Sequence, residues 1–89
     1  MKTVHAIITG RVQGVFYRGW TVEQARALNL SGWVRNRPDG SVEAVFRGPP
    51  ESVEVMVRRC HDGPPAARVD GVSVKPHDED PGQGFRQIR

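Results

Sequence analysis

The chain has 89 residues, of which 37% are hydrophobic and 26% are charged, so it is long enough for one domain with a modest core and too short for two. No apolar run approaches the roughly 18 residues that a membrane-spanning helix needs, and the N-terminus reaches Gly10 too soon for a signal peptide. The net charge of +3 favours anionic partners, and the single cysteine, Cys60, excludes an internal disulfide. We therefore expect one soluble, cytoplasmic domain over residues 1–89 that makes no membrane contact.

The apolar spacing alternates along the chain between the period of a strand and the period of a helix. The predicted elements, in chain order, are a strand over 4–9, a helix over 18–28, strands over 32–36 and 42–47, a helix over 49–60, a strand over 69–74 and a short strand over 85–88. Asn29 can end the first helix in the left-handed conformation, and Pro38 with Gly40 can form the hairpin turn. We also expect a bulge at Asp70–Gly71 and a polar, acidic loop over 76–84.

The order strand, helix, strand, strand, helix, strand is typical of the ferredoxin-like βαββαβ sandwich, which is an α+β fold. We expect an antiparallel sheet of four to five strands with two helices on one face, because right-handed crossovers place both helices on the same side. Many unrelated activities share this fold, so the function must be argued from particular residues.

The first candidate site is the junction between the first strand and the first helix, residues 10–17. A helix N-terminus directs several free N–H groups at one point, which favours an anion there. Gly10 and Gly14 allow a left-handed or closely approaching backbone, and Arg18 can add a bidentate contact to a phosphate. On spacing alone, an anion site and a plain turn are equally good interpretations. The Lys and Ser/Thr of a nucleotide-binding P-loop are absent, so we expect neither Mg²⁺ nor a nucleotide.

Two longer motifs distinguish these interpretations. The run ITGRVQGVFYR over residues 8–18 resembles the first signature of the acylphosphatase family. The run GWVRN over residues 32–36, followed by Gly40, Val42 and Gly48, resembles the second signature. The family usually has Phe or Met where this chain has Tyr17, a change that we expect to do little beyond adding a hydroxyl. The resemblance covers most of the chain.

The resemblance implies hydrolysis of the carboxyl–phosphate anhydride of acyl phosphates to a carboxylate and inorganic phosphate, with no metal and no cofactor. It also implies that Arg18 and the loop amides bind the phosphoryl group and that Asn36 orients the attacking water. The expected phosphate-binding loop consists of Gln13, Gly14, Val15, Phe16, Tyr17 and Arg18. Without the resemblance, Asn36 is better explained as the cap of the hairpin turn. The expected partners are a small acyl phosphate and its product phosphate, bound by a monomer that binds no nucleic acid.

Other functions predict features that can be compared with this sequence. Cys60 has Ala66 where cysteine-dependent phosphatases need arginine, and its helical spacing indicates a buried, chemically quiet thiol. Residues 78–80 are an acidic run in a late loop, and the three histidines lack metal-ligand spacing. The alternative function is a non-catalytic ferredoxin-like module that binds an anion or RNA, or a regulatory domain. RNA binding would need solvent-facing aromatic rings on the central strands, whereas Phe46 is expected to pack inward.

Overall fold

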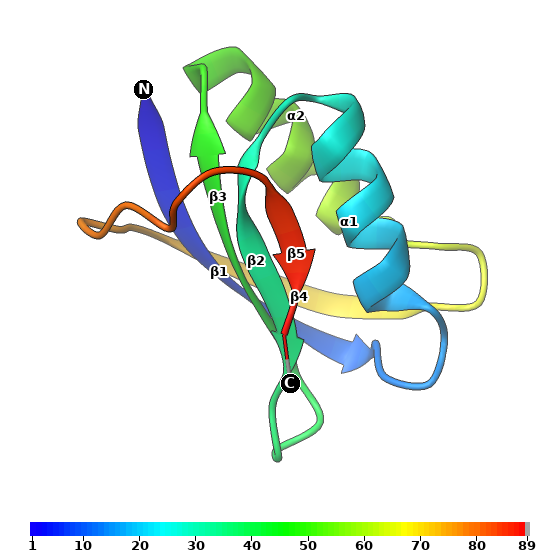
Figure 1. Cartoon of the computed structure of the whole chain (residues 1–89). Helices are drawn as coiled ribbons and strands as arrows, with labels where there is room; N and C mark the ends of the chain where they lie inside the picture. Colours follow the sequence, from blue (N-terminus) through cyan, green and yellow to red (C-terminus); the bar gives the residue numbers. More distant parts are fainter. Residues whose placement is uncertain (89) are drawn as a thin grey trace.

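The structure is a computed structural model that describes residues 1–88, and the predicted strands and helices all form in it (Figure 1). In chain order, the elements are β1 (Lys2–Arg11), α1 (Tyr17–Ala27), β2 (Ser31–Asn36), β3 (Val42–Gly48), α2 (Pro50–Cys60), β4 (Arg68–Pro76) and β5 (Phe85–Gln87). β1 and β4 are longer than their apolar stretches, because their backbone pairing continues beyond them, from Val4 opposite Pro76 to Arg11 opposite Arg68. Within residues 1–88, neither helix is long and apolar enough to cross a membrane.

The strands form a sheet in the order β4-β1-β3-β2-β5. β1 pairs antiparallel with β3 and β4, and β3 pairs antiparallel with β2, as the ferredoxin-like fold requires. β5 instead runs parallel to β2, with Gly32 opposite Phe85, so the sheet is mixed and the expectation of a wholly antiparallel sheet is wrong in this strand. The reason is the connection over 77–84, which carries the chain from the β4 edge to the β2 edge and reverses its direction (Figure 1).

Both helices cover one face of the sheet, where α1 packs on β2 and β5 and α2 packs on β1 and β3 (Figure 1). The core between the layers consists of inward-facing strand residues and the apolar helix faces, among them Val4, Ala6, Ile8, Val34, Val42, Ala44, Phe46, Val53, Met56 and Cys60. Phe46 is fully buried and its ring stacks on Phe85, which confirms that it packs inward. Burial of a side chain of this size contributes about 1.5–3 kcal/mol to stability.

The end of β1 differs from the prediction. Gly10 still belongs to β1, where the register against β4 shifts and leaves Asp70 unpaired, so the bulge expected at Asp70–Gly71 is confirmed. A Cβ atom at Gly10, whose φ is 121°, would lie 2.2 Å from the Arg68 carbonyl oxygen. Gly10 therefore permits the close approach of β4, and the loop before α1 is shorter than expected, residues 12–16.

Tyr17 links the two helices at the start of α1. Its hydroxyl is buried and donates a 2.7 Å hydrogen bond to the backbone carbonyl of Cys60, the last residue of α2. Burial raises the pKa of the Tyr17 phenol well above its usual range and raises the pKa of the Cys60 thiol to about 12, so both groups stay protonated. The expected burial of the Cys60 thiol in the core is thus confirmed. The Tyr17 hydroxyl also donates to a carbonyl at the end of α2 that lacks a partner within the helix. Tyr17 therefore has a larger structural role than we expected from its difference from Phe or Met.

We expect Tyr17→Phe to lower the free energy of unfolding by about 1–3 kcal/mol, because the buried Cys60 carbonyl loses its donor while the ring keeps its packing. Urea unfolding followed by circular dichroism measures the change. Ser73→Ala, which removes an exposed hydroxyl from β4, is the matched control and should change the unfolding free energy by less than about 0.5 kcal/mol. Equal stability of the two variants would contradict a structural role for the Tyr17 hydroxyl.

Candidate functional site

A cavity of about 160 Å³ opens where the 12–16 loop, the start of α1 and the end of β2 meet. Its lining residues are Val12, Gln13, Gly14, Phe16, Tyr17, Arg18, Gly19, Asn36 and Gln87. The fold therefore brings Asn36 to the predicted phosphate-binding loop, although the two are separated along the chain by the whole of α1. Val15 is the exception among the predicted loop residues, because it is half-buried against the core and does not line the cavity. A larger hollow of about 510 Å³ lies at the other end of α1 and contains none of these residues.

The backbone of the loop gives the cavity the character of an anion site. Gly14 and Phe16 have positive φ angles of 74° and 68°, which coil the loop directly in front of α1. α1 has no side-chain cap within the described residues and no acidic residue in its first turn, and its first internal hydrogen bond runs from the Trp20 N–H to the Phe16 carbonyl. The N–H groups of the first turn and the positive end of the helix dipole thus favour an anion.

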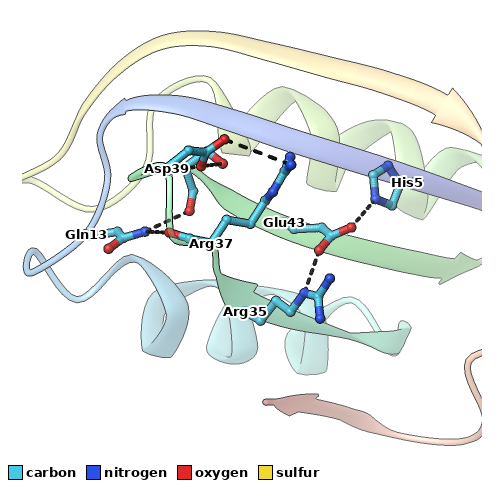
Figure 2. A network of polar contacts seen from close by, with 7 residues as sticks. His5, Gln13, Arg35, Arg37, Asp39 and Glu43 are labelled. Atoms are coloured by element: carbon cyan, nitrogen blue, oxygen red, sulfur yellow. Dashed lines mark hydrogen bonds and ion pairs between the residues drawn. The ribbon is translucent and has the colours of Figure 1, made fainter. Parts of the chain in front are cut away.

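Gln13 holds the β2–β3 hairpin beside this loop (Figure 2). Its Nε2 donates hydrogen bonds of 2.8 Å to the Arg37 carbonyl and 2.9 Å to the Ser41 carbonyl. Asp39 closes the same turn by accepting hydrogen bonds from the backbone N–H and the hydroxyl of Ser41. The side-chain N–H groups of Gln13 therefore both bind the hairpin. Within the predicted loop, this residue can donate only its backbone N–H to a phosphate.

The arginines of the hairpin are paired with carboxylates (Figure 2). Glu43 accepts hydrogen bonds from His5 and from Arg35, and Arg37 lies 3.9 Å from Asp39. Burial raises the pKa of Glu43, but the hydrogen bonds from His5 and Arg35 outweigh it, so the pKa lies below its usual range. The hydrogen bonds from Ser41 likewise lower the pKa of Asp39. Both carboxylates are therefore ionised near neutral pH, and they balance the positive charges of Arg35 and Arg37.

Arg18 differs from the hairpin arginines. It is half-buried in the wall of the cavity, and none of the ion pairs found within residues 1–88 involves it. Its guanidinium can therefore donate to an external anion without first breaking an internal pair. A guanidinium next to a helix N-terminus binds phosphate in a bidentate geometry that a single ammonium group cannot reproduce.

Asn36 is the last residue of β2 and lines the same cavity. Its Oδ1 atom is buried and has no hydrogen-bond partner among residues 1–88. Leaving a buried acceptor without a donor costs about 1–3 kcal/mol, so such atoms are rare in folded proteins and ask for an explanation. The interpretation of Asn36 as a turn cap does not supply one, because Gln13 and Asp39 close the turn. A hydrogen-bond donor bound in the cavity would explain why this buried acceptor is tolerated.

Sequence reasoning missed Val12, Gly19 and Gln87 as lining residues. Val12 and Gly19 directly flank the predicted loop, so their place in the chain could have suggested them. Gln87 reaches the cavity on β5, whose pairing places it opposite Val34 of β2. No local pattern indicates that pairing, because β5 has only three residues.

The chain is similar to known proteins in both sequence and structure. The sequence matches the family model "Acylphosphatase" over residues 4–87. An acylphosphatase of Rhodospirillum rubrum is 56% identical over 87 residues, which cover 98% of this chain and 96% of that protein. The crystal structure of acylphosphatase from Bacillus subtilis has a TM-score of 0.94 at 33% identity and covers 100% of both chains. The structure of an acylphosphatase from Coxiella burnetii also has a TM-score of 0.94 at 33% identity, covering 98% of this chain and 92% of that chain. The chain belongs to the acylphosphatase family.

Proposed function

We propose that this chain hydrolyses acyl phosphates in the cavity, where Arg18 and the loop amides bind the phosphoryl group and Asn36 orients the attacking water. Membership of the acylphosphatase family supports the reaction. The observation that carries the assignment of residues is the buried Oδ1 of Asn36, which has no partner among residues 1–88 and belongs to a residue that lines the cavity. The competing function, a non-catalytic anion-binding or RNA-binding module, leaves that atom unexplained.

In the proposed mechanism, the phosphoryl oxygens accept hydrogen bonds from the first N–H groups of α1 and from the Arg18 guanidinium. These donors are in place before the reaction, so they stabilise the charge that develops on the phosphoryl oxygens without reorganisation. The Oδ1 of Asn36 accepts a hydrogen bond from the water and directs a lone pair of the water toward the phosphorus atom. Holding the two reactants in line removes much of the entropic cost of bringing them together.

The bond changes need no strong base or acid. The water oxygen bonds to phosphorus while the bond from phosphorus to the carboxyl oxygen breaks, and a proton of the water passes to a phosphate oxygen of the substrate. A carboxylate leaves readily, because the pKa of its acid is about 4. The cavity fits this chemistry, since its lining within residues 1–88 includes no His, Asp, Glu, Cys or Lys. The Tyr17 hydroxyl is committed to the Cys60 carbonyl in the core.

The test is release of inorganic phosphate from benzoyl phosphate by the wild-type chain in excess EDTA. We expect turnover in proportion to the enzyme concentration and unchanged by the chelator, because positioning and hydrogen bonding by this chain suffice for a substrate with a good leaving group. A folded wild-type protein that releases no phosphate above the uncatalysed rate would contradict the proposed function. Turnover that the chelator removes would contradict its independence of metal.

We further propose that the enzyme is monomeric, cytoplasmic and without a nucleic-acid partner. The cavity already contains every residue that the proposed mechanism uses, including Arg18 and Asn36, so the reaction calls for no residue of a second subunit. Cys60 is a buried free thiol, as suits a reducing compartment. The central strands β1 and β3 contain a single Phe, Tyr or Trp, Phe46, and its ring is buried instead of facing solvent, where this fold would stack a base.

A further inference from the structure

An exposed aromatic ring stands at the mouth of the cavity. Among residues 1–88, the large apolar side chains left in solvent are Met1, Phe16 and Val74, and Phe16 is the one ring, with 63% of its surface exposed. It is also the one of the three that lines the cavity. A single exposed apolar residue needs no explanation, but a ring beside a binding site is a surface on which an apolar ligand can pack.

The backbone of Phe16 is held in a conformation that large residues avoid. Its φ of 68° and ψ of 20° lie in the left-handed region, which is unfavourable for a side chain of this size. Glycine would adopt these angles without strain, as Gly14 does two residues earlier with a φ of 74°. Strain of this kind persists in folded proteins chiefly at functional sites.

The ring lies over Gly19 in the first turn of α1. A Cβ atom at Gly19 would come within 2.3 Å of the Cε1 atom and 2.6 Å of the Cζ atom of the Phe16 ring, so no larger residue allows this placement of the ring. Gly19 itself lines the cavity. The ring is therefore held against the rim of the cavity and exposes its remaining surface to solvent.

The cavity is small for a substrate with a bulky acyl group. Its volume of about 160 Å³ is well below the roughly 300–1,000 Å³ of pockets that enclose complete small-molecule ligands. The phosphoryl group and the attacking water occupy the interior in the proposed function. A bulky acyl group then extends to the mouth, where Phe16 stands.

We propose that Phe16 is a platform for the acyl group and makes the enzyme select acyl phosphates with a flat, apolar acyl group, such as an aromatic ring, over acetyl phosphate. This inference rests on the proposed function of the cavity. The exposed ring packs on a flat acyl group in an offset or edge-to-face arrangement, whereas an acetyl group offers one methyl. The acyl skeleton does not change during phosphoryl transfer, so the contact is kept from substrate to transition state and acts on kcat/KM.

The test compares benzoyl phosphate with acetyl phosphate in wild type, Phe16→Ala and Phe16→Trp. The readout is the ratio of the two kcat/KM values, because any loss common to both substrates cancels. We expect Phe16→Ala to lower the ratio of benzoyl to acetyl phosphate by about tenfold and Phe16→Trp, which keeps a flat ring, to retain it. Val74→Ala is the matched control, because it removes an exposed apolar side chain of β4 outside the cavity and should leave the ratio unchanged.

The outcomes distinguish this inference from the function on which it rests. A Phe16→Ala protein that turns over both substrates with the wild-type ratio overturns the platform and leaves the proposed function standing. A loss of the same factor for both substrates, with weaker inhibition by inorganic phosphate, means that Phe16 only shapes the loop and also overturns the platform. A wild-type protein that hydrolyses neither substrate overturns the proposed function itself.

Discussion

Replacing Arg18 by alanine is expected to lower kcat/KM for benzoyl phosphate by about 100-fold to 1,000-fold, the loss typical of removing one donor that stabilises transition-state charge. Arg18 has no internal ion pair within residues 1–88, so its whole charge is available to the phosphoryl group. Inhibition by inorganic phosphate should weaken in parallel, because in the proposed mechanism the same guanidinium binds the product. Steady-state kinetics with phosphate as competitor measure both effects.

Two further variants separate direct contact from general attraction of anions. Arg18→Lys keeps the positive charge but loses the planar pair of N–H donors of the guanidinium. It should therefore have only slightly more activity than Arg18→Ala. Arg11→Ala removes an exposed arginine at the end of β1 that does not line the cavity. We expect it to cause only a small decrease that disappears at high salt. If Arg11→Ala were as damaging as Arg18→Ala, Arg18 would be acting through long-range attraction alone.

Much of the fold could be predicted because it depends on local patterns. The alternation of Val4, Ala6 and Ile8 and the helical spacing of Val53, Met56 and Cys60 each place apolar side chains on one face, and all six are buried in the core. The element that was predicted least well is β5. It is too short to show the two-residue alternation of apolar side chains that identifies a strand. Its direction depends on the path of the connection over 77–84, which cannot be predicted from the residues of β5.

The candidate site was predictable as a motif but not as a set of contacts. The first signature identifies the loop that lines the cavity, yet the role of the Gln13 side chain depends on carbonyls 24 and 28 residues further along the chain. The Tyr17 hydroxyl similarly contacts a carbonyl 43 residues away. Such pairings become visible only when packing has set the distance between the segments, so a motif can name a residue without showing what its side chain does.

Replacing Asn36 by alanine should also remove most of the activity, but through a different step. We expect kcat for benzoyl phosphate to fall by about 100-fold or more, because in the proposed mechanism the attacking water loses the acceptor that holds it in line with the phosphorus atom. Inhibition by inorganic phosphate should stay close to wild type, since in the proposed mechanism Asn36 contacts the water and not the phosphoryl oxygens. Unchanged phosphate inhibition therefore distinguishes Asn36 from Arg18. Gln83→Ala, which removes an exposed carboxamide outside the cavity, should leave kcat unchanged.

The stability of the Asn36→Ala protein provides the second half of the test. Removing a buried oxygen that lacks a partner within residues 1–88 should leave the free energy of unfolding unchanged or raise it, whereas removing a turn cap would lower it by about 1 kcal/mol. Loss of activity together with retained stability is typical of a residue kept for function at a cost in folding. Urea unfolding of the same preparation used for kinetics decides between the two roles. A destabilised variant with wild-type kcat would show that Asn36 acts as the cap of the hairpin turn and not in catalysis.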